Sequence, residues 1–264
     1  MLIIVSAAAG CGGDGGGADL AAGGDLAVGG SADLSASTGG PSLCGGGGFR
    51  VCDGFEAAAI DKTIWPLVIT NGATVTLDAT HVARGAQALH VHTAGVTAGT
   101  NGGLRTMQGF PFPNDDLWGR VFVYMAGASP DQHTNMVEAV GPLTVDGGTT
   151  DAHYRLGVST AHVIAGNYIP GDYADHSATT MPLDRWACFE WHYDGAHDEY
   201  HVFVDGSELG DMAITTTHVP KWTAPSFAYL ELGLHLYHTL TDVPPLDVWY
   251  DELALDGARI GCAR

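Results

Sequence analysis

The sequence has little positive charge and no long apolar segment. Lysine and arginine together account for 10 of 264 residues, against 30 aspartate and glutamate residues, and the formal net charge is −20. A chain this acidic repels phosphate backbones, so we expect no nucleic-acid partner. No stretch beyond the N-terminus approaches the roughly 20 apolar residues that a membrane-spanning helix needs.

Zinc-binding signatures are also missing. The sequence contains no Cys-x-x-Cys pair and no His-Glu-x-x-His helix, which argues against a zinc finger or a zinc protease. The abundant carboxylates suit calcium better, because Ca²⁺ prefers oxygen ligands.

A short apolar stretch stands at the start of the chain, from Leu2 to Ala9, and leads directly into Gly10-Cys11. Small residues before a cysteine are typical of the site that a bacterial lipoprotein signal peptidase cuts, after which the cysteine is acylated. We therefore predict a signal peptide over residues 1–11, with a lipid on Cys11 as the only membrane contact. The chain would then lie in the cell envelope or outside the cell. The alternative is an ordinary flexible N-terminus with an unmodified cysteine.

The next segment, residues 12–48, consists almost entirely of Gly, Ala, Asp and Ser. It has too few apolar residues to offset the entropy lost on folding, so we predict a disordered linker. The remaining residues, 49–264, are enough for one domain with its own core, which we expect to be a monomer.

Four cysteines remain after Cys11, an even number that predicts two disulfides outside the cytoplasm. Four cysteines allow three pairings. We favour a local pair, Cys44–Cys52, where the linker meets the domain, and a long-range pair, Cys188–Cys262.

Alternation of apolar and polar residues with a period of two recurs along the domain, whereas helical periodicity is nearly absent. Gly- and Asp-containing turn signals separate the alternating segments. About ten to fourteen strands in one domain predict an all-β fold, a two-sheet antiparallel β-sandwich or jelly roll. The predicted strands are Val68–Leu77, Ala88–Thr93, Gly119–Ala126, Asn135–Val140, His153–Ser159, His162–Tyr168, Trp186–Tyr193, Glu199–Asp205, Ala228–Tyr237 and Leu246–Leu255.

The clearest alternation lies between residues 230 and 237, where every even position is leucine. We expect the leucines to face the core and the odd positions to face the other way. A carboxylate, an imidazole and a phenol in a row, with a glycine between them, suit the floor of a binding groove better than an ordinary solvated face. These residues are Glu231, Gly233, His235 and Tyr237.

Two other predicted strands carry similar side chains. His133 and Asn135 share one face of their strand, and the alternation puts Glu138 on the opposite face. His153 and Arg155 share the polar face of the next strand. Arg155 is either a site residue or a structural ion-pair partner. A third strand places Glu190 and His192 near a cysteine, and the candidate substrate-binding residues are therefore Asn135, Glu138, Glu190, His192 and Glu231.

Short motifs at both ends of the domain resemble concanavalin A-like jelly rolls. They are Val51-Cys52-Asp53-Gly54-Phe55-Glu56, Ala83-Arg84-Gly85-Ala86-Gln87-Ala88-Leu89 and Leu246-Asp247-Val248-Trp249-Tyr250-Asp251-Glu252-Leu253-Ala254-Leu255. With Trp186-x-Cys188-x-Glu190 and Phe203-Val204-Asp205-Gly206, they are similar to the cellulose-induced secreted proteins and the related glucuronan lyases, polysaccharide lyase family 20.

The resemblance implies a structural Ca²⁺ where the first and last strands lie side by side. Glu56 and Asp251 would supply carboxylates, and the turn near His81 and Gly85 would supply carbonyls. The alternative is that both carboxylates only cap strand ends.

The resemblance also implies lyase activity on a polysaccharide that contains uronic acid. Such β-elimination needs a group that neutralises the carboxylate, a base for the C5 proton and an acid for the leaving oxygen. Arg155 and Asn135 would neutralise the carboxylate, His133 or His235 would be the base, and Tyr237 would be the acid or base.

Two other functions stay open. A glycoside hydrolase needs two carboxyl groups about 5–9.5 Å apart, and Glu231 with either Glu190 or Glu138 would provide them. The glucanase pattern E-x-D-x-E is missing. A non-catalytic, lectin-like module would instead bind sugar on exposed aromatic rings, with Trp118, Trp191, Tyr154 and Tyr168 as candidates.

Overall fold

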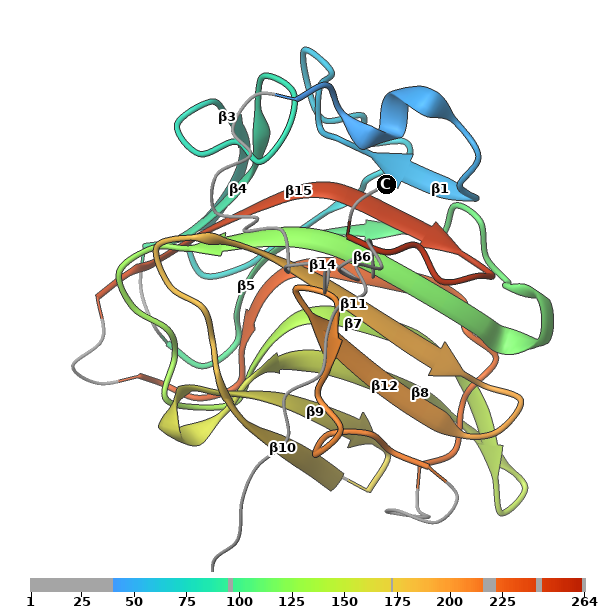
Figure 1. The fold of residues 1–264 in the computed structure, drawn as a ribbon. Helices are drawn as coiled ribbons and strands as arrows, with labels where there is room; N and C mark the ends of the chain where they lie inside the picture. The colour runs from blue at the N-terminus through green and yellow to red at the C-terminus, as the bar shows by residue number, and fades with distance from the viewer. Residues whose placement is uncertain (1–39, 95–96, 172, 216–221, 241–243, 263–264) are drawn as a thin grey trace, which may run out of the picture. The chain divides into compact units, whose positions relative to one another are not determined.

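The computed structural model describes residues 40–94, 97–171, 173–215, 222–240 and 244–262. Within these ranges there is no α-helix, and two antiparallel sheets pack face to face (Figure 1). Three short 3-10 turns are η2 (Leu43–Gly46), η3 (Pro113–Asp115) and η4 (Thr160–His162). The predicted antiparallel β-sandwich is confirmed.

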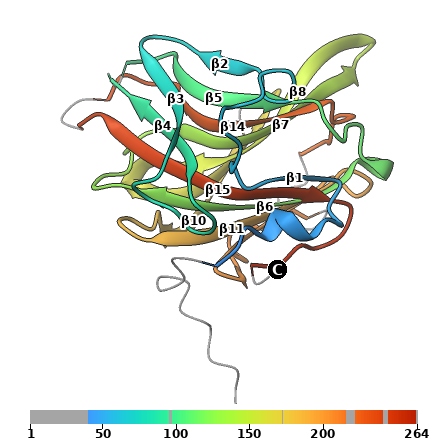
Figure 2. The ribbon, with the colours of Figure 1, turned by 90° about the horizontal axis from the view of Figure 1, so that it is seen from above.

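The first sheet has eight strands in the order β13-β12-β11-β6-β15-β4-β3, and β1 pairs with β15 as well. Figure 2 shows β1 and η2 beside β15, so the start of the described chain covers part of this sheet. The strands are β1 (Val51–Asp53), β3 (Ala73–Asp78), β4 (Ala88–Thr93), β6 (Asp116–Met125), β11 (Trp186–Asp194), β12 (Glu199–Val204), β13 (Ser207–Glu208) and β15 (Leu246–Asp256).

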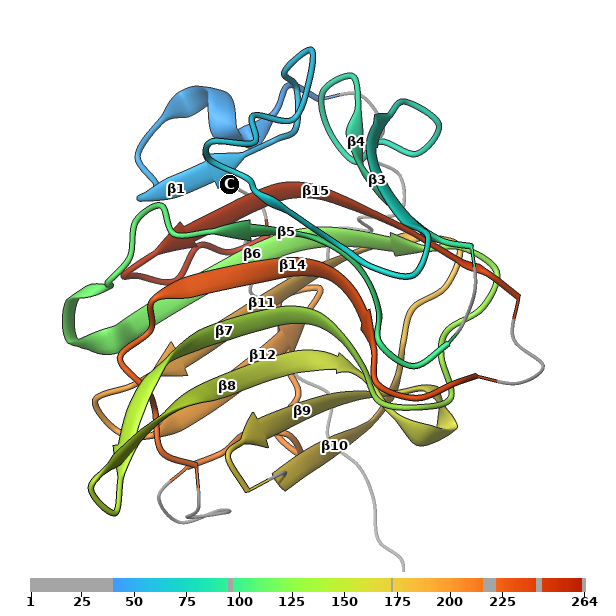
Figure 3. The ribbon, with the colours of Figure 1, turned by 180° about the vertical axis from the view of Figure 1, so that it is seen from behind.

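The second sheet has seven strands in the order β10-β9-β8-β7-β14-β5-β2, and Figure 3 looks onto its outer face. The strands are β2 (Leu67–Ile69), β5 (Thr100–Thr106), β7 (Thr134–Val145), β8 (Gly148–Val158), β9 (Val163–Ile169), β10 (Tyr173–Thr180) and β14 (Tyr229–Leu236).

The ends of the predicted strands differ from the observed ones, most of all in β7 and β8, which each extend five residues further into their shared turn. Two other differences concern whole strands. The segment Val68–Leu77 is not one strand, because a turn at Asn71 and Gly72, both with positive φ, carries the chain from β2 in one sheet to β3 in the other. The strands β1, β5, β10 and β13 were not predicted. In β5 two adjacent glycines lower the strand propensity, and β10 is mostly exposed and polar.

Alternating side chains from both sheets fill the space between them with one large apolar core. The leucines at 230, 232, 234 and 236 are all fully buried there, as the alternation predicts. Burial of this kind of surface contributes about 25 cal/mol per Å² and pins the register, because a slip by one residue would expose the whole row. The opposite face of β14 therefore has a fixed set of side chains.

Both predicted disulfides are confirmed. Cys44 is bonded to Cys52, and Cys188 on the central strand β11 is bonded to Cys262 in the C-terminal tail. Disulfides form and persist in oxidising compartments, which supports an extracytoplasmic location.

The structured region begins before Phe49, where the domain was predicted to start. The carbonyl of Gly40 accepts a hydrogen bond from the backbone of Gly85 (2.9 Å), and the backbone of Leu43 donates to Glu252 (2.7 Å). The predicted signal peptide, Cys11 and residues 12–39 lie outside the described residues. Among the described residues, no helix is long and apolar enough to cross a membrane.

Candidate active site

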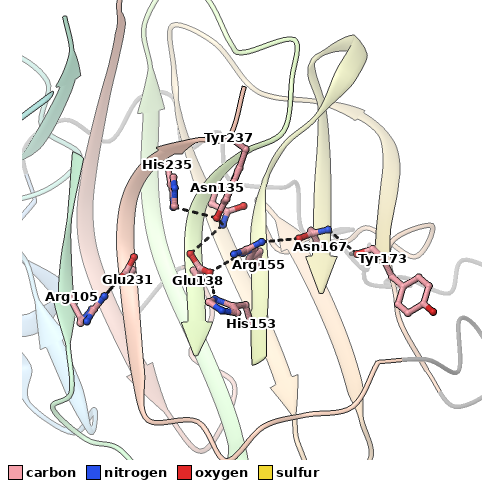
Figure 4. A network of polar contacts seen from close by, with 10 residues as sticks. All are labelled: Arg105, Asn135, Glu138, His153, Arg155, Asn167, Tyr173, Glu231, His235 and Tyr237. Carbon is pink, nitrogen blue, oxygen red and sulfur yellow. Dashed lines mark hydrogen bonds and ion pairs between the residues drawn. The ribbon is translucent and has the colours of Figure 1, made fainter. Parts of the chain in front are cut away.

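A polar depression lies on the outer face of the seven-stranded sheet, where β5, β14, β7 and β8 run side by side (Figure 4). Its volume is about 210 Å³. It is lined by Val68, Asn101, Arg105, Glu138, Val140, His153, Arg155, Tyr229, Glu231 and His235.

Strand β14 lies between β5 and β7 and runs through the middle of the site. Glu231 and His235 point away from the leucine row, and Tyr237 follows directly after the strand. Gly233, with a φ of 153°, lets β14 approach β5 closely, because a Cβ at this position would lie 2.2 Å from the carbonyl oxygen of Gly102. A side chain at residue 233 is therefore excluded, and the floor of the site stays low here.

Strand β7 contains a β-bulge that changes which of its side chains reach the site. Asn135 is paired with Gly157 and Val137 with Leu156, so Met136 is an extra residue on β7. The bulge corrects the prediction that Glu138 faces away from Asn135. Both side chains lie on the outer face, where the Asn135 amide donates to Glu138 Oε2 (3.2 Å).

Glu138 is the centre of a buried network of charges. Its Oε1 accepts hydrogen bonds from His153 and from Arg155 Nε (2.8 Å). Burial alone would raise the pKa of Glu138, but the His153 hydrogen bond and the Arg155 charge outweigh it and lower this pKa to about 2. Glu138 is therefore ionised at neutral pH, and its oxygens are engaged by neighbouring side chains.

The other residues that were predicted to be catalytic contact either the ring or the hydroxyl of Tyr237. Asn135 donates to the Tyr237 hydroxyl (2.9 Å), and His235 Nδ1 lies 3.2 Å from the same oxygen. The rings of His133 and His235 stack on Tyr237 at 4.8 and 4.2 Å, and the Arg155 guanidinium lies 4.8 Å from its centroid. The structure thus brings together all the side chains proposed for the chemistry. Their roles stay predictions.

The surroundings of His235 and Tyr237 determine the protonation state of each side chain. Burial, with the nearby Arg155 and His153 charges, lowers the pKa of His235, although the Glu138 charge acts in the opposite direction. Burial and the negative charge of Glu138 raise the pKa of Tyr237 above its ordinary value. At neutral pH the imidazole is therefore neutral and the phenol is protonated, as a base and an acid must be before they react.

Arg105 is a site residue that the sequence analysis missed. Its side chain is 41% exposed, whereas that of Arg155 is only 10% exposed, and its guanidinium lies 4.3 Å from the centroid of Tyr229. Arg105 donates to Glu231 Oε1 from Nε (2.8 Å). The alternation of β5 could have indicated this residue, because Leu104 is buried and Arg105 faces outward. The two glycines of this segment prevented its prediction as a strand.

Glu190 and His192 do not belong to this site. They lie on β11, where the residues that alternate with them enter the core, so both face outward from the eight-stranded sheet. Glu190 is fully buried beneath the C-terminal tail and pairs with Arg259 (3.1 Å). His192 stacks on Trp118 at 4.1 Å. The predicted pair of Glu190 with Glu231 is therefore wrong, because the two sheets present opposite outer faces, and neither Glu190 nor His192 lines the depression.

Most of the aromatic residues considered for sugar stacking are also unavailable. Trp191 and Tyr154 are fully buried in the core, and Tyr168 is 3% exposed. Trp118 is half-buried on the eight-stranded sheet, with one ring face covered by His192. These residues do not form a stacking platform at the depression.

The two carboxylates of the predicted calcium site both accept hydrogen bonds from the backbone of one turn, residues 83–86. Glu56 accepts from the backbone of Ala86 (2.9 Å), and Asp251 Oδ2 accepts from Ala83 (2.9 Å) and Arg84 (3.0 Å). A Cβ at Gly85 would lie within 2.1 Å of the Glu56 carboxylate. No group of three or more His, Cys, Asp and Glu side chains among the described residues is placed to hold a metal ion. Hydrogen bonds from the turn therefore satisfy the Glu56 and Asp251 carboxylates, and calcium at this position stays a prediction.

A thermal-shift measurement tests that prediction. Burial raises the pKa of Asp251 to about 7, so a bound cation would relieve the cost of its charge. With a dissociation constant of about 10⁻⁴–10⁻³ M, about 10 mM calcium is expected to add roughly 1–3 kcal/mol of stability. The melting temperature should rise in the native chain and stay constant in Asp251→Asn. An unchanged melting temperature in the native chain would remove the calcium prediction.

Comparisons with solved structures agree with the architecture. A cellulose-induced protein, Cip1, matches with a TM-score of 0.65 and 21% identity over 81% of this chain and 100% of its own. An endo-β-1,4-glucuronan lyase from the fungus Trichoderma reesei has a TM-score of 0.57 and 13% identity, over 79% of this chain and 95% of its own. An alginate lyase from a Chlorella virus has a TM-score of 0.51 and 10% identity, over 75% and 98%.

No protein-family model and no curated protein sequence matches the chain. The structural neighbours are jelly-roll sandwich proteins, so the resemblance drawn from the sequence motifs is confirmed at the level of the fold. At these identities the likeness concerns the fold alone.

Proposed function

We propose that the chain is a polysaccharide lyase that cleaves a uronic-acid-containing polymer by β-elimination. The observation that carries the proposal is the pair His235 and Tyr237, 3.2 Å apart, with a neutral imidazole and a protonated phenol beside two arginines. The names of the structural neighbours, which include glucuronan and alginate lyases, support the same class of substrate.

In the proposed reaction Arg105 binds the carboxylate of the uronate, since it is the more exposed of the two arginines. Charge neutralisation makes the C5 proton more acidic. His235 takes that proton, the electrons of the C5–H bond form a C4–C5 double bond, and the C4–O4 bond breaks. Tyr237 gives its proton to O4. The imidazolium then returns its Nδ1 proton to the phenolate across the 3.2 Å contact, and exchange with water moves the remaining ring proton from Nε2 back to Nδ1.

The close spacing of base and acid has a stereochemical consequence. Both groups approach the sugar from one side, so the substrate should carry its C5 hydrogen and C4 oxygen on the same face of the ring. Polyglucuronate and polymannuronate meet this condition, and polyguluronate does not.

An assay on these three polymers, with cellulose as a neutral control, tests the function. A lyase produces a double bond conjugated with the carboxyl group, which absorbs ultraviolet light. A hydrolase releases reducing ends without that absorbance, and a lectin-like module is retained on the polymer without cleaving it. Absence of the ultraviolet signal on all of the uronates would remove the proposal.

Arg105 offers a separate prediction within this proposal. Arg105→Ala is expected to lower kcat/KM about 10–100-fold, because one charge-assisted contact with the substrate carboxylate is lost. Arg105→Lys should recover part of the loss, and added salt should weaken substrate binding less in the alanine variant than in the native chain. Equal activity of the alanine and native proteins would contradict the assignment.

The hydrolase alternative has one observation in its favour. Glu231 and Glu138 lie opposite each other in the register of β14 and β7, and their pKa values are moved apart, because burial raises that of Glu231. However, Glu138 is 4% exposed and its carboxylate accepts from three side chains. A nucleophile or base in a hydrolase must reach the sugar or a water beside it, so β-elimination is the better proposal.

We also propose that the protein acts outside the cytoplasm, held by a lipid on Cys11. The two disulfides support the compartment. Metabolic labelling with a fatty-acid analogue tests the anchor, which Cys11→Ala should abolish. Labelling that survives the substitution would exclude Cys11 as the lipid site.

A further inference from the structure

Asn135 occupies a position that does not fit binding of the substrate carboxylate. An asparagine amide has two N–H donors. In this site one donates to the Tyr237 hydroxyl (2.9 Å) and the other to Glu138 Oε2 (3.2 Å). The residue is 3% exposed. With both donors engaged and almost no exposed surface, Asn135 has nothing left to offer a carboxylate in the groove.

We infer that Asn135 is a positioning residue that fixes where the Tyr237 proton points, an inference that rests on the proposed lyase function. The ionised Glu138 sets the orientation of the amide, because the reverse orientation would place two oxygens 3.2 Å apart. The amide must therefore present N–H to the Tyr237 oxygen, even though its own Oδ1 is left buried without a partner among the described residues. A buried oxygen without a partner is unfavourable, and the amide keeps this orientation because it meets the charge of Glu138 and the hydroxyl of Tyr237.

The same oxygen of Tyr237 has a second nitrogen neighbour. His235 directs Nδ1 toward it at 3.2 Å, which leaves Nε2 as the ring nitrogen available to the substrate. For Nε2 to act as a base, the imidazole proton must sit on Nδ1 and be donated to Tyr237. The phenol oxygen then accepts two N–H bonds, so its own hydrogen points at neither of these two nitrogens.

This arrangement serves the proposed reaction twice. Before the reaction it keeps the acidic proton of Tyr237 away from Asn135 and His235, so that the proton is free for the leaving oxygen. When the proton has been given up, the two N–H groups of Asn135 and His235 stabilise the phenolate that remains. The β-bulge at Met136 makes the arrangement possible, since without it Asn135 and its anchor Glu138 would face opposite sides of the sheet.

Kinetics separate this role from carboxylate binding. Asn135→Ala and the isosteric Asn135→Asp, which cannot donate, are expected to lower kcat about 10²–10³-fold with KM nearly unchanged. Thr134→Val is the matched control, because Thr134 is a buried polar neighbour on the same strand, and its kcat should stay within a few-fold of the native value. A rise in KM with little loss of kcat would overturn the inference in favour of carboxylate binding.

A measurement without substrate tests the contact directly. In nuclear magnetic resonance spectra, the side-chain amide signal of Asn135 is expected to shift in Tyr237→Phe, and His235 is expected to carry its proton on Nδ1 in the native protein. An unchanged Asn135 signal, or a proton on Nε2, would overturn the inference. If these spectra agree but no uronate polymer is cleaved, the proposed function fails while the positioning of the phenol stands.

Discussion

Tyr237→Phe is expected to lower kcat about 10³-fold or more on the best uronate polymer, with the fold unchanged. The substitution removes one oxygen, which is the general acid of the proposed elimination and the group that Asn135 and His235 both contact. Loss of a positioned acid alone accounts for about 10²–10⁴-fold in rate. The ring contacts with His133 and Arg155 remain, so binding should change little. Initial rates from the ultraviolet signal measure the effect.

A companion variant at the base makes the test specific. His235→Gln should lower kcat to a similar extent, and the double variant should be little worse than either single one, because groups that act as a unit are not additive. In the native enzyme kcat/KM should fall at low pH as His235 becomes protonated, and burial, which lowers the pKa of His235, moves that fall to a lower pH than for an ordinary histidine. Full activity of Tyr237→Phe would contradict the assigned chemistry.

The side chains of the site were predictable where a strand obeys strict alternation. The leucine row from residue 230 to 236 fixes the face of Glu231 and His235, and this follows from the sequence alone. The same rule failed at Glu138, because the bulge at Met136 depends on how β7 pairs with two neighbouring strands. Local sequence does not contain that information.

Two other errors have different physical origins. Alternation predicts which side chains of a strand face away from the core, and this prediction was correct for Glu190 and His192. It does not predict which of the two sheets contains the strand. Arg105 was missed for the opposite reason. Its strand has weak propensity and is held in place by its neighbours β14 and β2, so tertiary pairing decides its structure.

The second large effect is expected on stability, at Glu138. Its carboxylate compensates the buried Arg155 and accepts a hydrogen bond from His153, so Glu138→Gln leaves a buried positive charge without its counter-charge. Breaking such a pair costs about 3–5 kcal/mol. A fall in pKa from 4.5 to about 2 corresponds independently to about 3 kcal/mol. Urea denaturation at neutral pH should therefore show a loss of about 3 kcal/mol.

The pH dependence of this loss distinguishes a charge effect from a packing effect. The pKa of Glu138 is lower in the folded protein, so its contribution is complete above the unfolded value near 4.5 and is lost as the pH falls toward 2. The gap between native and Glu138→Gln proteins should shrink over that interval. Glu208→Gln is the control. Glu208 and its partner His201 both lie on the eight-stranded sheet, with His201 Nδ1 2.8 Å from Glu208 Oε1, and the Glu208 side chain is 41% exposed. That variant should lose less than about 1 kcal/mol. A gap at Glu138 that stays constant with pH would show that shape, and not charge, holds the centre of the site together.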